Sequence, residues 1–245
     1  MSQHLSQSDP LSRVLYIDLS RLRYWVQERP DIFDPGMGGA GAAIRLLEEE
    51  CPPGADPLGP ENPIIFAVGP LVGFYPLASK TVAMFKSPHT GNLGESHAGG
   101  RSAVAIRMAG YGAIVIRGRS TRPVYVVIDE DKIYFKDASA LWGMRSSYAV
   151  GAVVRTQTSG SGMRSIMRIG RAGEQQISYA SVITETYRHF GRLAGLGRRL
   201  DHDLRIAQRL AQVHLHAGDF GVGHPDDGRL GGRHGEPRCL RRSVI

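Results

Sequence analysis

The sequence has few of the features that mark membrane, secreted or cluster-binding proteins. Its most apolar stretch, residues 64–78, is interrupted by two prolines and is shorter than the roughly 18 residues that a membrane span requires. Residues 1–13 are polar and lack the apolar segment of a secretory signal, so we expect a cytoplasmic protein without a membrane partner. Cys51 and Cys239 are the only cysteines, so the chain lacks both a disulfide framework and the thiolates that an iron–sulfur cluster requires.

The overall composition is that of a folded globular protein. Of the 245 residues, 42% are hydrophobic and 22% are charged, which excludes wholesale disorder and leaves room for one large domain or two small ones. The net charge of +7 is compatible with nucleic acid, an anionic surface or an anionic cofactor as partner. Because no basic run is interleaved with aromatic residues and no zinc-finger spacing occurs, we expect no nucleic-acid partner.

The hydrophobic pattern predicts an α+β fold. Helical segments and strands mix without regular βαβ alternation, which favours a mixed two-layer β-sheet domain with a few short helices over a doubly wound sheet. The predicted strands are 14–19, 64–68, 81–85, 113–117, 163–169 and 177–184, with a hairpin of 124–128 and 132–135. The predicted helices are 42–50, 101–108 and 138–156, the last with a weak point at Gly143.

The composition changes near the C-terminus. Residues 13–197 form the predicted domain, whereas the last 48 residues hold nine Arg and five His but no Lys or Tyr. Few apolar residues there recur at a fixed period, so we interpret 198–245 as a solvated, disordered tail. Metal binding by His214 and His216 is a less favoured alternative.

Three glycine-rich segments combine exposed backbone with nearby cations. They are Gly36–Gly41, Gly91–Gly100 and Gly170–Gly197, the last of which contains Arg171, Arg188 and Arg192. Backbone N–H groups in tight turns and at helix starts bind phosphate, and arginine adds a bidentate charged donor. None of the segments follows the dinucleotide or Walker pattern, so the sequence indicates an anionic ligand other than NAD or ATP.

Six short motifs, in order along residues 14–197, resemble the N-terminal domain of tungsten-dependent aldehyde:ferredoxin oxidoreductases. The motifs are Asp56–Asn62 (DPLGPEN), Val68–Leu71 (VGPL), Lys86–Gly91 (KSPHTG), Ala109–Val115 (AGYGAIV), Asp137–Ser139 with Leu141–Gly143, and Gly170–Glu174 (GRAGE). The resemblance implies a domain that forms the base for a tungsten atom held by the dithiolenes of two pterins. It also implies a magnesium ion that bridges the pterin phosphates.

The resemblance also assigns site residues. The implied cofactor-binding residues are Lys80, His97, Ala98, Gly99, Arg188, His189, Gly191 and Arg192. In the family the magnesium contacts at the positions of His97 and His189 are made by main-chain carbonyls, and no protein atom need ligate the tungsten. Four residues depart from the family: Lys80 stands where Arg is usual, His97 where Asn is usual, His189 where a small residue is commoner, and Ala40 where Arg is frequent.

In the family, the domains that carry out the reaction follow the region that this sequence resembles. The cysteine ligands of the [4Fe-4S] cluster, the substrate channel and the acid/base residues belong to later helical domains, so we assign no catalytic residue to this chain. After Gly195–Gly197 the family pattern stops, which suggests a truncated or frame-shifted gene near Ala194. We therefore expect a separate chain that carries the C-terminal domains, and ferredoxin as the electron acceptor.

Three functions are consistent with these patterns. The chain could be the pterin-binding part of an enzyme that converts aldehyde and water to carboxylate, although it is inactive alone. It could be a non-catalytic remnant, which we prefer for the isolated chain, or, less favoured, a basic nucleic-acid-binding module. The aldehyde and the choice between tungsten and molybdenum stay open, because the pocket walls lie outside the sequence.

Overall fold

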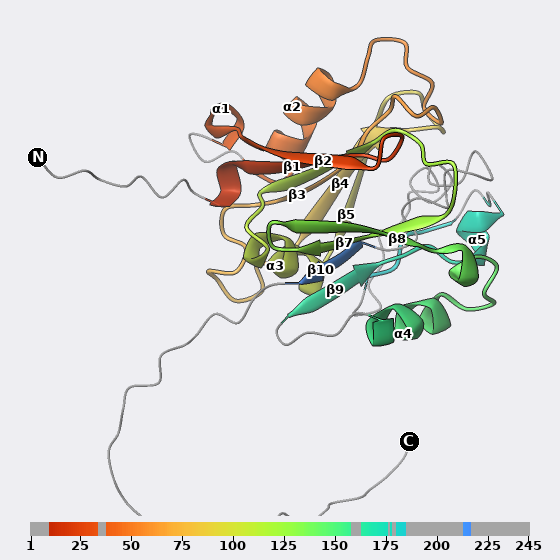
Figure 1. Ribbon diagram of the computed structural model, residues 1–245. Coiled ribbons are helices and arrows are strands. Elements are labelled where there is room, and N and C mark those ends of the chain that lie inside the picture. The colour runs from red at the N-terminus through yellow and green to blue at the C-terminus, as the bar shows by residue number, and fades with distance from the viewer. Residues whose placement is uncertain are drawn as a thin grey trace, which may run out of the picture.

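Two stacked β-sheets form the body of the protein in the computed structural model. The structure describes residues 10–33, 38–157, 163–175, 177, 180–184 and, for the backbone only, 213–216. One sheet, sheet A, carries helix α2 on its outer face, and helix α4 lies on the outer face of the other sheet, sheet B (Figure 1). Helix α3 packs against both sheets at one end. This arrangement confirms the α+β fold with a mixed two-layer sheet.

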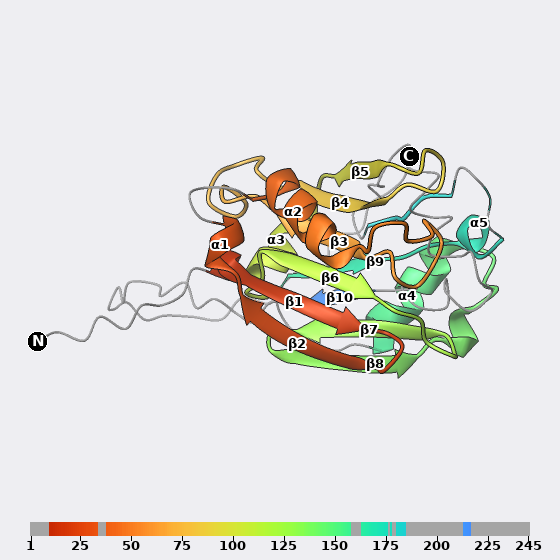
Figure 2. The ribbon, with the colours of Figure 1, turned by 90° about the horizontal axis from the view of Figure 1, so that it is seen from above.

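Sheet A has six strands in the order β2-β1-β6-β3-β4-β5. The strands are β1 (Arg13–Asp18), β2 (Arg23–Glu28), β3 (Ile64–Val68), β4 (Thr81–Lys86), β5 (Leu93–Ala98) and β6 (Ala113–Arg117). Only β1 and β6 pair in parallel, and the other neighbours are antiparallel (Figure 2). Strand β3 is buried at every position, because sheet B and α3 cover one face and α2 the other.

Sheet B has four strands in the order β8-β7-β10-β9. They are β7 (Val124–Asp129), β8 (Lys132–Asp137), β9 (Arg164–Met167) and β10 (Val213–His216). In β7, Val124, Val126 and Ile128 belong to the main core, while Tyr125 and Val127 join a second cluster that includes Val154 of α4. This alternation follows from the period of two along a strand.

The helices are short. They are α1 (Pro30–Phe33), α2 (Ala40–Glu50), α3 (Arg101–Met108), α4 (Ser147–Gln157) and α5 (Arg171–Glu174), with 3-10 turns η1 (Pro10–Ser12) and η2 (Ser139–Leu141). No described helix is long and apolar enough to cross a bilayer.

Several predicted elements differ from the structure. The helix predicted over 138–156 is divided into η2 and α4, because Gly143 takes the positive φ of 79° that ends regular helix. Of the strand predicted over 177–184, the described residues 177 and 180–184 form one bridge, between Arg168 and Ile183. Strands β2 and β5 were not expected, since β2 is an edge strand with no buried residue and β5 is polar on its exposed side.

A short strand lies within the predicted C-terminal tail. Strand β10 lies between β7 and β9, parallel to the first and antiparallel to the second. Residues 213–216 lie within the predicted tail, and the rest of 198–245 lies outside the described residues, so the predicted disorder of the tail stays a prediction. His214 and His216, the metal-binding alternative, lie in this strand, which is described only as backbone.

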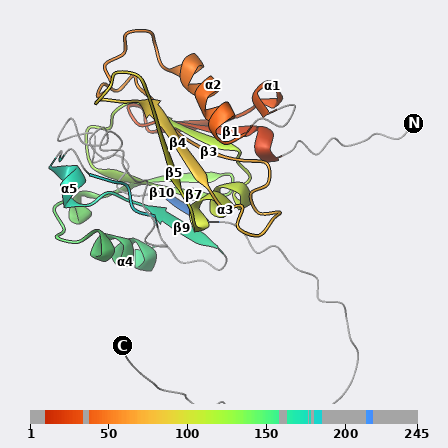
Figure 3. The same cartoon turned by 180° about the vertical axis from the view of Figure 1, so that it is seen from behind.

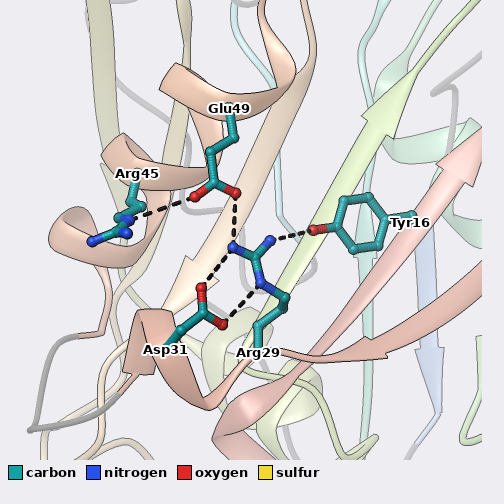
Figure 4. A network of polar contacts seen from close by, with 5 residues as sticks. All are labelled: Tyr16, Arg29, Asp31, Arg45 and Glu49. Atoms are coloured by element: carbon teal, nitrogen blue, oxygen red, sulfur yellow. Dashed lines mark hydrogen bonds and ion pairs between the residues drawn. The ribbon is translucent and has the colours of Figure 1, made fainter.

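A polar network around Arg29 attaches α2 to the N-terminal hairpin (Figure 4). The Arg29 guanidinium donates to Asp31 at 2.9 and 3.0 Å, to Glu49 of α2 at 2.7 Å and to the Tyr16 hydroxyl at 3.2 Å. The hydrogen bond from Arg29 holds the pKa of the Asp31 carboxyl below its usual value. The network fixes α2 near its C-terminal end and so fixes where its N-terminus lies.

Candidate functional site

A hollow of about 480 Å³ lies where the start of α2 meets the loop between β3 and β4, the start of β4 and the end of β5. Its wall is mostly apolar, and Lys80 and His97 are its basic side chains. The residues that line it are Gly39, Gly69, Pro70, Leu71, Val72, Leu77, Ala78, Ser79, Lys80, Val82 and His97. A hollow with apolar walls and a few polar groups at one place is the usual form of a ligand site.

The pairing of β4 with β5 brings four of the predicted site residues together. Thr81 is opposite Ala98 and Val82 is opposite His97, so Lys80 and Gly99 flank the same end of the strand pair. Lys80 is exposed and His97 is partly exposed at the rim of the hollow. Lys80 and His97 are far apart in the sequence, and the antiparallel register of β4 and β5 brings them together.

The N-terminus of α2 lies beside the hollow. Gly39, with φ 55°, is the N-cap, and its N–H donates to the carbonyl of Val68 at the end of β3 at 2.9 Å. No side chain among the described residues caps the helix, and the N–H groups of its first turn have no partner within the helix. These groups and the positive end of the helix dipole favour an anion beside Gly39.

The glycines permit a close approach between the two loops. A Cβ on Gly38 would lie 2.9 Å from the Pro70 Cδ and 3.3 Å from the Gly69 Cα. Any larger residue at Gly38 would push the loop after β3 away from the start of α2. The small residue therefore keeps the helix N-terminus at the edge of the hollow.

His97 has an acidic partner on its own strand. Its Nε2 lies 2.6 Å from Oε1 of Glu95, and both side chains are 40% exposed. Glu95 and His97 are on the same side of β5 because they are two residues apart. The pair holds the imidazole at the rim.

The motifs behind the family resemblance serve the fold as well as the site. Asn62 of the DPLGPEN motif is fully buried, and its amide donates to the carbonyls of Pro57 at 2.8 Å and Lys86 at 2.9 Å. Its oxygen accepts from the Lys86 N–H at 3.0 Å, and the Lys86 Nζ donates to the carbonyl of Ala55 at 2.7 Å. These bonds clamp the proline-rich segment to the end of β4.

The second predicted group of site residues cannot be placed. Arg188, His189, Gly191 and Arg192 lie outside the described residues, so their proximity to Lys80 stays a prediction. The predicted magnesium contacts of His97 and His189 also stay a prediction, because they concern main-chain carbonyls. Among the described side chains no group of three or more His, Cys, Asp or Glu is arranged to hold a metal ion.

Sequence reasoning missed part of the lining. The Gly91–Gly100 segment was expected to be a phosphate-binding loop, yet residues 93–98 form β5 and only its end borders the hollow. Gly69, Pro70 and Leu71 were noted as a motif but not as site residues. Their position directly after the buried strand β3 could have identified them as site residues, because a turn there faces the ends of the neighbouring strands.

Comparison with known proteins defines the family. A model of the aldehyde ferredoxin oxidoreductase N-terminal domain matches residues 14–202. The chain belongs to the aldehyde ferredoxin oxidoreductase family. The tungsten-containing aldehyde ferredoxin oxidoreductase of Thermococcus kodakarensis is 37% identical over 187 residues, which cover 76% of this chain and 30% of the relative. The protein of the same name from Pyrococcus furiosus is 38% identical over 162 residues, covering 66% of this chain and 26% of the relative.

A solved structure has the same fold as this aldehyde ferredoxin oxidoreductase domain. The active-site complex BamBC of benzoyl coenzyme A reductase, in complex with 1,5-dienoyl-CoA, matches with a TM-score of 0.77 and 28% identity. The match covers 85% of this chain and 31% of that one. The chain thus spans about 30% of the length of the relatives it matches.

Proposed function

We propose that this chain binds the phosphate-bearing end of a tungstopterin cofactor as the N-terminal domain of a tungsten oxidoreductase. The observation that carries the proposal is the meeting of Lys80, His97 and the uncapped N-terminus of α2 at one hollow. The tungsten-containing relatives support the choice of cofactor.

The residues present fit such a ligand. Lys80, the His97 ring and the first-turn N–H groups of α2 are donors suited to a phosphate. Val72 and Val82 offer apolar wall to the flat ring system. When bound, the tungsten dithiolene supplies a Lewis acid and an acceptor for two electrons.

In this proposal the chain's own residues bind and orient the cofactor. Lys80 neutralises phosphate charge, and α2 fixes the phosphate with backbone donors that need no rearrangement on binding. Arg188 and Arg192 would hold the second pterin. A magnesium ion between the phosphates would be bound by the carbonyls of His97 and His189.

The reaction proposed for the complete protein is the oxidation of an aldehyde with water to a carboxylate, with electrons passed to ferredoxin. Two cysteines cannot bind a [4Fe-4S] cluster, so in this proposal the ligands of the cluster lie outside the given sequence. The relative from Thermococcus kodakarensis extends well beyond the 30% of its length that this chain matches. By itself, the chain is proposed to be inactive.

The test is the tungsten and pterin content of the purified chain, alone and after co-expression with a polypeptide carrying the later domains. Lys80→Ala should lower pterin retention about tenfold, because an ion pair with phosphate is lost. Lys80→Arg should retain the pterin, and Lys132→Ala, an exposed lysine on β8, is the matched control. His97→Asn should also retain it if the contact is made through the carbonyl.

Three results would count against the proposal. Absence of tungsten and pterin from both preparations would leave the chain a non-catalytic remnant, the alternative function. Equal pterin retention by the Lys80→Ala and Lys132→Ala variants would show that the hollow does not bind the pterin. Tight RNA or DNA binding that falls steeply with salt would instead support a basic nucleic-acid-binding module.

A further inference from the structure

A second hollow, of about 360 Å³, lies at the ends of β1 and β6. Its charged lining residues are Asp18, Arg21, Glu50, Glu61 and Arg117, which are three carboxylates and two guanidiniums. Asp18 ends β1 and Arg117 ends β6, and the two residues are direct neighbours in the parallel pairing of these strands. In open α/β sheets, ligands bind in crevices at the carboxyl ends of parallel strands. The position and the volume of the second hollow therefore suit a small molecule.

The second hollow is separate from the candidate site. Helix α2, which lies over sheet A in Figure 3, reaches from one to the other. Its N-cap residue Gly39 lines the candidate site, and its last residue, Glu50, lines the second hollow. A helix of 11 residues is about 16 Å long, and the two hollows share no lining residue. A ligand in the second hollow is therefore bound independently of the pterin.

Hydrogen bonds hold the walls of the second hollow together. The Gly118 N–H donates to the Pro60 carbonyl at 3.0 Å, and the Arg119 N–H donates to the Ser20 hydroxyl oxygen at 2.6 Å. The Asp18 carboxylate accepts from the Ser20 N–H at 2.9 Å. Gly118 has a φ of 83°, and a Cβ there would lie only 2.7 Å from the Ser20 hydroxyl oxygen. Three distant segments of the chain are thus fixed around the hollow, which lowers the entropic cost of binding a ligand.

The end of α2 favours a cationic group in the second hollow. Residues 48–50 are all glutamates, and the last turn of the helix has no basic residue. Carboxylates there add to the negative end of the helix dipole, and nearby cations stabilise such an arrangement. Glu50 pairs with Arg117 at 2.8 Å. Glu61 is exposed and has no hydrogen bond or ion pair with any residue that the structure describes, so its carboxylate is available to a cation.

The two arginines give the same hollow a place for a carboxylate. The Arg117 guanidinium lies 5.1 Å from the centre of the Trp25 ring, and its ion pair with Glu50 holds it in one orientation. The Arg21 side chain is 74% exposed and lies 3.9 Å from the Asp18 carboxylate. Guanidinium groups bind carboxylates through two parallel hydrogen bonds. The lining therefore suits a ligand that carries both a carboxylate and an ammonium group.

We propose that the second hollow binds a basic α-amino acid. Arg21 and Arg117 bind its carboxylate, and Glu61 and the acidic end of α2 bind its ammonium groups. The three carboxylates of the lining exceed the two guanidiniums by one, so a ligand with a net charge of about +1 balances the charge of the site. This site differs in ligand chemistry from the candidate site and does not rest on the proposed function.

The experiment is a calorimetric titration of the full chain with L-lysine as the probe. L-Norleucine lacks the side-chain ammonium group and cadaverine lacks the carboxylate, so each should bind about tenfold or more weakly than L-lysine. Glu61→Gln and Arg21→Gln should each weaken L-lysine binding about tenfold. Glu48→Gln and Arg145→Gln change exposed residues outside the lining, and these variants should bind L-lysine like the unmodified chain.

Tryptophan fluorescence locates the bound ligand. L-Lysine should change the emission of Trp25, because the ligand's carboxylate contacts the guanidinium that lies on this ring. Trp25→Phe should lose this change while it retains the heat of binding.

Three outcomes would overturn the proposal. One is the absence of L-lysine binding at millimolar concentrations. Another is equal affinity for L-lysine and cadaverine, which would make the hollow a site for simple cations. The third is equal affinity of the Glu61→Gln and Glu48→Gln variants for L-lysine, which would place the ligand elsewhere on the molecule.

Discussion

Asn62 and Lys86 are joined by a pair of hydrogen bonds, in which the buried amide of Asn62 donates to the Lys86 carbonyl at 2.9 Å and accepts from its N–H at 3.0 Å. The side chain thus takes the place of a neighbouring strand at the end of β4. This geometry explains why the DPLGPEN and KSPHTG motifs occur together in one chain.

Replacing Asn62 should destabilise the domain strongly. Asn62→Ala removes three partly buried hydrogen bonds and leaves backbone groups of Pro57 and Lys86 without these partners, which should cost about 3 kcal/mol. The measurement is the free energy of unfolding in urea. Asn92→Ala, at an exposed position, should change it by less than about 0.5 kcal/mol. Equal effects of the two variants would show that the clamp does not stabilise the fold.

Gly112 should tolerate no side chain. A Cβ there would overlap the Leu11 carbonyl oxygen and lie 2.9 Å from the Phe33 ring, so Gly112→Ala should cost about 3 kcal/mol or more. Gly69→Ala is the control, because nothing lies within 4 Å of its Cβ position. Thermal unfolding of the two variants side by side tests the packing of η1 against β6. A melting temperature of Gly112→Ala equal to that of the control would contradict it.

Alkaline pH should unfold the protein partly through Tyr111. Burial raises the pKa of its phenol to about 12, and the hydroxyl donates to the Glu130 carbonyl at 2.8 Å. Because an unfolded tyrosine ionises near pH ~10, the stability present below that pH is lost as the pH rises towards 12.

The Tyr111→Phe variant isolates this contribution. It should be less stable at neutral pH by about 1 kcal/mol, since the hydrogen bond is lost, but its stability should fall less steeply above pH ~10. Urea unfolding from pH 8 to 11.5 measures both effects, and Tyr134→Phe, an exposed tyrosine on β8, should follow the unmodified chain. Parallel pH profiles for all three proteins would refute the role of Tyr111.

Removal of β10 should weaken sheet B. A chain ending at residue 202 lacks the strand between β7 and β9, so backbone groups on both strands lose their partners. Its melting temperature should fall by roughly 5 °C or more compared with a chain ending at residue 217. Amide hydrogen exchange should accelerate at Val126 and Ile128, whereas β3 should stay protected. Equal exchange in both chains would mean that β10 does not stabilise the sheet.

The sequence alone determined most elements of the fold. The continuous apolar run of Ile64–Val68 and the polar tip between Val124 and Phe135 were sufficient to predict β3 and the β7–β8 hairpin, because burial and turn chemistry are local signals. The ordered motifs also predicted the family. The hydrophobic pattern could not predict β2, because an edge strand with no buried residue shows no alternation of apolar and polar residues.

The tertiary structure decided which of these residues meet. Lys80 and His97 share a rim only because β4 and β5 pair in one register, and Gly39 joins them because α2 is anchored by Arg29. Asp18 and Arg117 line the second hollow together only because β1 and β6 pair in parallel. Such long-range contacts depend on the free energy of the whole packed chain, and no short window of sequence contains that information.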